Sequence, residues 1–264
     1  MMNFNIFFLF IFLSSPAMAF TMSDSQGRAF NNNDINIHIS PTSCAGAGFS
    51  TSELKNMVEN AVDDYWNAVP TSSIKLNVKD INSSMDIDGL DHDGALATIV
   101  PLSSIVAGCN DDVPDFSNPG ILGAAVLNCS SSDCKAVLIL NATSGSYLNN
   151  KSAREIEAVI AHEIGHAVGL GHTEIKYNLM YYSVSGKTQN WLGQDDIDGI
   201  SYLYPNKAEL GGLLGSCGTI DLDDDSNRFY LNFLAALLLF LIIIRLSIKL
   251  LAINYRQLFS IKLN

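Results

Sequence analysis

The stretch HEIGHAVGLGH at residues 162–172 carries the strongest signal in this chain. On an α-helix, residues four apart share a face, so His162 and His166 can offer their imidazoles to one metal ion. His172 lies six residues after His166 and cannot use that face. Because a glycine adopts positive φ without strain, Gly169 can end the helix and turn the chain back. We therefore predict that His172 becomes the third ligand.

Three imidazoles with an open fourth position are typical of catalytic zinc, whereas structural zinc is usually closed by four protein ligands. Glu163 follows His162 directly and is expected beside a metal-activated water, as the general base in peptide-bond hydrolysis. A bare H-E-x-x-H also occurs in ordinary amphipathic helices. Gly169 and the third histidine make the zinc interpretation far more specific.

On both sides of this motif, the pattern of apolar and polar residues predicts a small sheet with two or three long helices. The motif helix is expected over residues 151–170, beginning with a capping box formed by Ser152 and Glu155. A second helix is expected over 50–69, capped by Thr51 or Ser52, and a last one begins near Gln194. Residues 80–118 are expected to be rich in loops. Alternating or apolar runs predict strands at 34–39, 73–79, 121–127 and 136–140. The fold class is α+β, or mixed α/β.

These residues resemble the metzincin clan of zinc proteases and, within it, the matrixin family. NLMY at 178–181 is similar to the family's Met-turn, which implies that Met180 forms an apolar floor beneath the metal. LGQDDIDGI at 192–200 is similar to the family's C-terminal helix. The resemblance implies that Asp195 and Asp196 support the Met-turn and the mature N-terminus, and that the sheet is small and twisted. The alternatives are a core methionine and two acids favoured by the helix dipole.

Tyr182 departs from the vertebrate matrixin pattern, in which a proline follows Met-Tyr. The spacing from Met180 to Tyr182 instead resembles astacins and serralysins, in which such a tyrosine touches the zinc site. Tyr182 is thus a candidate catalytic residue that hydrogen-bonds the oxyanion, with a plain pocket wall as the alternative. A different metzincin family is the corresponding alternative for the whole chain.

Both ends of the 264-residue chain are interpreted as targeting segments. Residues 1–19 are interpreted as a secretory signal peptide, followed by a short segment at 20–32, a catalytic domain at 33–205 and a Gly-rich, then acidic, linker at 206–228. Residues 229–253 are interpreted as a transmembrane anchor or a sorting segment similar to bacterial ones, and 254–264 as a basic cytoplasmic tail. The protein is therefore expected outside the cell or at its surface.

The composition narrows the expected partners. The formal net charge of −12 argues against nucleic acid as a partner. The protease interpretation makes a peptide or protein the expected partner, and the chain is expected to be a monomer. Five cysteines in an exported chain imply disulfides, with Cys129–Cys134 and Cys44–Cys109 as plausible pairs. Cys217 is left over, either as a point of processing or lipidation or as a free cysteine beside a plain membrane anchor. The acidic stretch 86–94 is a weak candidate for Ca²⁺, with a solvated loop as the alternative.

The sequence therefore predicts a secreted or membrane-tethered zinc endopeptidase. The competing hypothesis from another class is a zinc-containing binding or adhesion module without activity. Glu163 separates the two hypotheses, because a binding module does not need a general base.

Overall fold

The computed structural model describes residues 20–24, 26–111, 116, 118–131, 133–183 and 191–206. All of them belong to one compact unit, residues 1–212. The helices and strands, in chain order, are β1 (Asp34–Ile39), η1 (Ala45–Ala47), α1 (Thr51–Ala61), η2 (Val62–Trp66), β2 (Lys75–Ile81), α2 (His92–Thr98), β3 (Ser104–Asn110), β4 (Gly123–Cys129), β5 (Cys134–Asn141), η4 (Tyr147–Asn150), α3 (Ala153–Ala167) and α4 (Gln194–Leu203).

One five-stranded sheet organises this unit, with the strand order β2-β1-β3-β5-β4. Four strands are parallel, and β4 alone runs antiparallel, beside β5. All seven residues of β3 are buried, as expected for a central parallel strand covered on both faces. Within the described residues β4 is an edge strand, so one side of its backbone is not paired in the sheet. The predicted mixed α/β class is confirmed.

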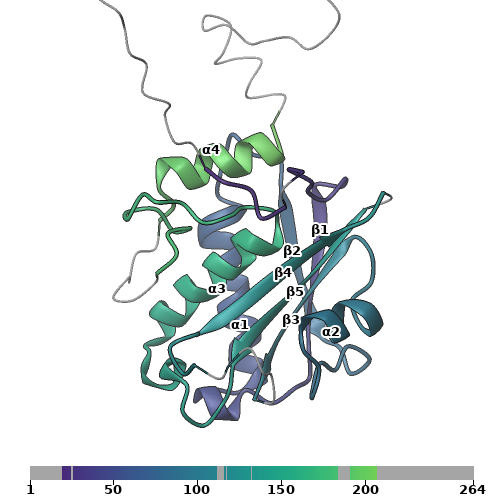
Figure 1. Cartoon of the computed structure of the whole chain (residues 1–264), viewed down its shortest axis with the longest axis vertical. Coiled ribbons are helices and arrows are strands. Elements are labelled where there is room, and N and C mark those ends of the chain that lie inside the picture. Colours follow the sequence, from purple (N-terminus) through teal and green to yellow (C-terminus); the bar gives the residue numbers. More distant parts are fainter. Residues whose placement is uncertain are drawn as a thin grey trace, which may run out of the picture. The chain divides into compact units, whose positions relative to one another are not determined.

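The sheet separates two apolar cores, and β5 contributes to both because its side chains alternate between faces. Ala136, Leu138 and Leu140 pack with α1 and α3 in the larger core. Val137 and Ile139 pack with α2 in the smaller one. Figure 1 shows α1 and α3 on one side of the sheet, α2 on the other, and α4 across the top. The helix that carries the HEIGH segment is therefore pressed against the sheet along its length.

The predicted helix over 50–69 divides into α1 and a π-helical turn, Val62–Trp66. Its cap differs from the prediction. Ser50, rather than Thr51 or Ser52, accepts a hydrogen bond from the backbone N–H of Glu53, and the Glu53 carboxylate accepts one from the backbone N–H of Ser50. Because this reciprocal pair needs Glu at the third helical position, Ser50 is the only one of the three with a suitable partner.

The prediction of a loop-rich region at 80–118 is wrong in part, because α2 and β3 lie within it. Asp91 caps α2 by accepting a hydrogen bond from the N–H of Gly94 at 2.7 Å. β3 carries no polar alternation, since both of its faces are buried. A short helix and a strand of this kind leave little periodic signal in the sequence.

Two disulfides are present, with the pairing that the sequence made plausible. Cys44–Cys109 links the segment before η1 to the end of β3, across 65 residues of chain. Cys129–Cys134 closes the hairpin between β4 and β5 and spans five residues. Cys217 lies outside the described residues.

The predicted targeting segments also lie outside the described residues, namely 1–19, the linker after Asn206, 229–253 and 254–264. Within the part of the chain that the structure describes, no helix has the length and apolar character needed to cross a bilayer. The signal peptide and the anchor remain predictions.

The two disulfides are predicted to differ in their contribution to stability. Loop-closure entropy assigns about 4 kcal/mol to the 65-residue loop and about 2 kcal/mol to the five-residue loop. Replacing both cysteines of each pair by alanine should therefore lower the free energy of unfolding more for Cys44–Cys109, as measured by urea denaturation. An equal or larger loss for Cys129–Cys134 would show that another effect dominates.

Candidate metal centre

Helix α3 carries the first two histidines and is fixed at both ends. Ser152 caps its first turn, and its hydroxyl and backbone exchange hydrogen bonds with Glu155, as the sequence predicted. Ile156, Ile160 and Ile164 are buried along one face of the helix, which anchors it against the sheet. His162 and His166 are one helical turn apart, so both imidazoles lie on the same side of α3. His162 is buried and His166 is partly buried.

The chain reverses immediately after α3. Gly169 has a φ of 115°, a left-handed value that a residue with a side chain adopts only with strain. The N–H of Leu170 donates back to the carbonyl of Gly165 at 2.8 Å, which closes the turn. His172 then faces His166 with their Nε2 atoms 3.1 Å apart, the same distance as between the Nε2 atoms of His166 and His162. The three imidazoles converge as predicted.

Hydrogen bonds fix the protonation of the first two rings. Nδ1 of His162 lies 2.7 Å from the carbonyl oxygen of Leu179, and Nδ1 of His166 lies 2.8 Å from that of Leu170. Because a carbonyl oxygen only accepts, each Nδ1 carries the proton, and the Nε2 lone pairs point at one another. Burial lowers the pKa of His166 to about 4, and it also lowers the pKa of His172. Burial therefore favours the neutral form of these two rings.

This arrangement fits a divalent cation. Zinc–nitrogen bonds of about 2.0–2.1 Å place tetrahedral ligand nitrogens roughly 3.3 Å apart, close to the spacing of these three rings. Neutral imidazole is also a preferred zinc ligand. Among the described residues, these three histidines are the only group of three or more potential ligands within reach of one ion.

Glu163 lines the same cleft as the three histidines and is buried, with a relative exposure of 7%. In the metal-free chain, burial raises the pKa of Glu163 to about 8, and a hydrogen bond from the backbone of Ala125 opposes that rise only in part. A cation bound by the imidazoles would favour the charged carboxylate. Glu163 thus lines the same cleft as the three histidines, and its role as general base remains a prediction.

The segment 178–181, predicted as the Met-turn, packs against α3 and contacts His162 through the carbonyl of Leu179. Met180 is buried, and a Cβ placed on Gly165 of α3 would lie 2.3 Å from its sulfur atom, so the turn and the helix touch. Asp196 of α4 holds this turn in place. Its carboxylate accepts hydrogen bonds from the N–H groups of Leu179 at 2.6 Å, Met180 at 3.0 Å and Gly193 at 2.8 Å. The carbonyl of Leu179 accepts the hydrogen bond from Nδ1 of His162, so Asp196 contributes to the orientation of His162 by fixing the turn.

Asp195 is buried beside Asp196, and its role differs. One of its carboxylate oxygens has no hydrogen-bond partner within the described residues. The predicted contribution of Asp195 to anchoring the N-terminus therefore remains a prediction. Only Asp196 of the pair contacts the Met-turn through an observed bond.

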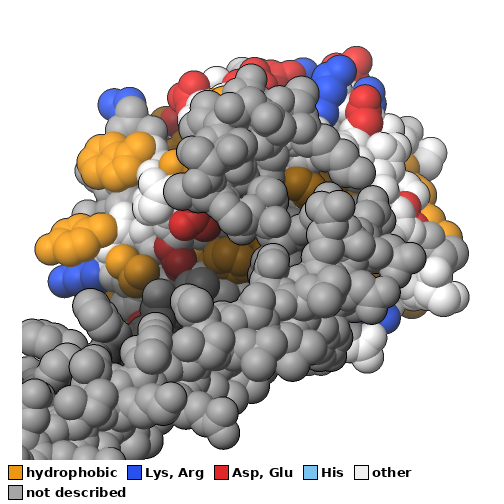
Figure 2. Space-filling model, turned by 90° about the horizontal axis from the view of Figure 1, so that it is seen from above, with side chains coloured by type: hydrophobic (Ala, Val, Ile, Leu, Met, Phe, Trp, Pro, Cys, Tyr) orange, Lys and Arg blue, Asp and Glu red, His pale blue; other side chains and the backbone are white. Residues whose placement is uncertain are grey.

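Tyr182 lines the cleft but is 66% exposed. Its ring lies 4.2 Å from that of Tyr181, and a side-chain hydrogen bond between the two raises the pKa of Tyr181. Tyr182 is one of several large hydrophobic residues exposed to solvent, and Figure 2 shows hydrophobic side chains projecting from one side of the face seen from above. The phenol of Tyr182 is thus hydrogen-bonded to Tyr181, and its role in binding the oxyanion remains a prediction.

A cleft of about 650 Å³ contains the three histidines and Glu163. Residues 120–125, which lead into and include the start of edge strand β4, line the cleft, as do Tyr182 and Ser183. Tyr147, Asn150 and Lys151 line it near the start of α3. An unpaired strand edge beside an open cleft can pair with an extended peptide by adding a strand to the sheet.

The acidic stretch 86–94 makes internal contacts. Asp86 accepts a hydrogen bond from the hydroxyl of Thr42 at 2.7 Å, and Asp91 caps α2. These bonds give two carboxylates of the stretch a role in stabilising the fold that needs no metal ion. A calcium site there remains a prediction.

Sequence reasoning did not identify the role of Gly171 or of the segment before residue 33. A Cβ on Gly171 would lie 2.5 Å from Oγ1 of Thr21, so the N-terminal segment passes directly against the turn that bears His172. The sequence did offer a signal, namely Gly171 directly before the predicted metal ligand His172. A glycine at such a position often marks a close approach of another backbone segment.

Comparisons with known proteins agree with this geometry. The sequence model of the matrixin family matches residues 29–205, more than half of the chain. The chain is 35% identical over 85 residues to Metalloendoproteinase 2-MMP of Arabidopsis thaliana, covering 32% of this chain and 22% of that protein. It is 50% identical over 54 residues to Metalloendoproteinase 1 of Glycine max, covering 20% of this chain and 18% of that protein. The matches thus span about a fifth of these relatives' length.

Asp196→Asn is predicted to lower the free energy of unfolding by about 1.5–3 kcal/mol. The amide offers one acceptor oxygen where the carboxylate offers two, so at least one buried N–H of the Met-turn loses its partner. Asp198→Asn is the matched control, because Asp198 lies exposed on the same helix and pairs only with Gln194 among the described residues. Equal losses for the two variants, measured by urea denaturation, would contradict the anchoring role.

Proposed function

This chain belongs to the matrixin family, and we propose that it is a zinc-dependent endopeptidase that hydrolyses peptide bonds of proteins outside the cell. One observation carries the proposal. Three imidazole Nε2 atoms converge within one cleft, and the carboxylate of Glu163 lines that same cleft. A closed structural zinc site would instead use four protein ligands and would leave no position for a substrate.

In the proposed reaction, His162, His166 and His172 hold zinc, and Glu163 moves the proton. Zinc in such a site supplies a Lewis acid that polarises a carbonyl oxygen and lowers the pKa of water. The carboxylate of Glu163 takes the proton of the attacking water and delivers it to the leaving amine. The burial of Glu163 keeps bulk water from competing for that proton.

The proposed substrate is an extended peptide segment. The cleft runs along residues 120–125, where the free edge of β4 offers backbone donors and acceptors. Pairing with this edge would hold the peptide backbone in place whatever its side chains, and pockets along the cleft would select among side chains. We propose this strand addition as the mode of substrate binding.

The proposed location is outside the cell. Two disulfides in the described part of the chain support an oxidising compartment, because such bonds are rare in reducing ones. Export by residues 1–19, tethering by residues 229–253 and a monomeric state are part of the same proposal.

Glu163→Gln is predicted to lower kcat/KM on casein by at least about a hundredfold while zinc content stays at one ion per chain. The amide is nearly isosteric but cannot accept the proton. Glu157→Gln is the matched control, because Glu157 lies on the same helix and pairs with Asn60 at 2.7 Å, away from the cleft.

Proteolysis that persists in the wild-type protein after chelation, or that persists in the Glu163→Gln variant, would contradict the mechanism. If the purified wild-type chain holds zinc but cleaves neither casein nor gelatin, the alternative of an inactive binding module gains support instead.

Tyr182→Phe is predicted to leave kcat within about threefold of wild type. Tyr182 is exposed and its phenol pairs with Tyr181, a geometry that favours a role as cleft wall. A loss of about a hundredfold in kcat at unchanged KM would assign it the oxyanion role instead. Steady-state kinetics on one peptide substrate distinguish the two roles.

A further inference from the structure

The third imidazole is held differently from the other two. Nδ1 of His162 and Nδ1 of His166 each donate to a backbone carbonyl. Within the described residues, Nδ1 of His172 has no such acceptor, and this side chain is the most exposed of the three. The position of the third ring must therefore depend on the backbone that carries it.

That backbone is held by the segment before β1, which we call the N-terminal strap (residues 20–24 and 26–31). The N–H of Gly171 donates to the carbonyl of Thr21 at 2.7 Å, and the N–H of Ser23 donates to the carbonyl of Gly169 at 2.9 Å. These bonds form an antiparallel bridge between Met22 and Leu170. The hydroxyl of Thr21 also donates to the carbonyl of His172 itself.

Two glycines permit this close approach. A Cβ on Gly171 would lie 2.5 Å from Oγ1 of Thr21 and 2.8 Å from the carbonyl oxygen of Met22. A Cβ on Gly199 of α4 would lie 3.0 Å from the ring of Phe20. The strap is therefore packed between the ligand turn and α4, where a side chain at either glycine would displace it.

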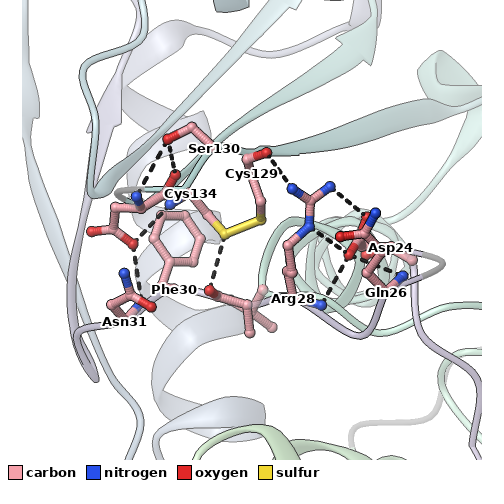
Figure 3. Close-up of a disulfide and its surroundings, with 12 residues drawn as sticks. Asp24, Gln26, Arg28, Phe30, Asn31, Cys129, Ser130 and Cys134 are labelled. Carbon is pink, nitrogen blue, oxygen red and sulfur yellow. Dashed lines mark hydrogen bonds and ion pairs between the residues drawn. A yellow bond between two sulfur atoms is a disulfide. The ribbon is translucent and has the colours of Figure 1, made fainter.

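The other end of the strap is tied to the hairpin that Cys129–Cys134 closes. The guanidinium of Arg28 donates to the carbonyl of Cys129 at 2.8 Å and to the carboxylate of Asp24 at 3.0 and 3.1 Å, as Figure 3 shows. The N–H of Asn31 donates to the side chain of Asp133 at 2.9 Å. A disulfide-closed hairpin is a rigid anchor, so the strap cannot easily move away from the turn.

We propose that the N-terminal strap is a positioning element for the metal centre and that Thr21 is its positioning residue. By fixing the backbone of Gly171 and His172, the strap replaces the side-chain orientation that His172 lacks. The inference rests on the proposed zinc site and adds a contribution from a segment outside the predicted catalytic domain, which began at residue 33.

The test compares zinc affinity in three variants of the full chain, measured by competition with a chromophoric chelator. Thr21→Val removes the hydroxyl at nearly constant volume and is expected to weaken zinc binding about tenfold, in the range seen when a residue that orients a ligand is lost. Thr21→Ser keeps the donor and should stay within about twofold of wild type. Thr98→Val is the matched control, because the hydroxyl of exposed Thr98 donates to the carbonyl of Gly94 on α2, across the sheet.

A second readout separates positioning from stability. In the cobalt-substituted protein, Thr21→Val should change the visible absorption bands of the metal, and Thr21→Ser should restore them. The metal-free forms of Thr21→Val and Thr98→Val should unfold at similar temperatures.

The proposal is overturned if Thr21→Val binds zinc within twofold of wild type with unchanged cobalt bands. It is also overturned if Thr98→Val weakens zinc binding as much as Thr21→Val does. Wild-type protein that binds no zinc would instead remove the proposed function, so the two failures are distinguishable.

Discussion

The reversal of the chain at Gly169 is the constraint on which the metal centre depends. A helix can present two histidines four residues apart, but geometry forbids a third ligand six residues later on the same face. The positive φ of Gly169 and the bond from Leu170 to Gly165 end α3 and bring His172 back within 3.1 Å of His166. Without that reversal, the helix would offer only two nitrogens to an ion that prefers four ligands.

Around this turn, the structure supports each ring from a different part of the chain. The carbonyl of Leu179 orients His162, and Asp196 of α4 fixes the Met-turn that contains Leu179. The carbonyl of Leu170 orients His166 from within the turn itself. The backbone of His172 is bonded to Thr21 in the N-terminal strap. Because each ring depends on its own support, loss of one support is expected to weaken the site even when the others remain.

The same fold supplies the cleft. β4 is the edge strand of the described sheet, and its first residues line the same cleft as the three histidines. The Cys129–Cys134 hairpin continues β4 and also receives Arg28 of the strap. One short hairpin thus connects the strand that lines the cleft with the N-terminal strap.

The sequence by itself determined the local features of this protein. The capping box at Ser152, the histidine spacing and the glycine at 169 are short-range patterns, so they predicted α3, the three converging rings and the likeness to matrixins. Both disulfide pairs were plausible but not fixed. Only the tertiary structure decided that α2 and β3 lie within the region expected to be loop, that Asp196 rather than Asp195 bonds to the Met-turn, and that Thr21 meets His172. The physical reason is range: caps and helical faces depend on residues within four positions of one another, whereas Thr21 and His172 are 151 residues apart and meet only through the packing of the whole domain.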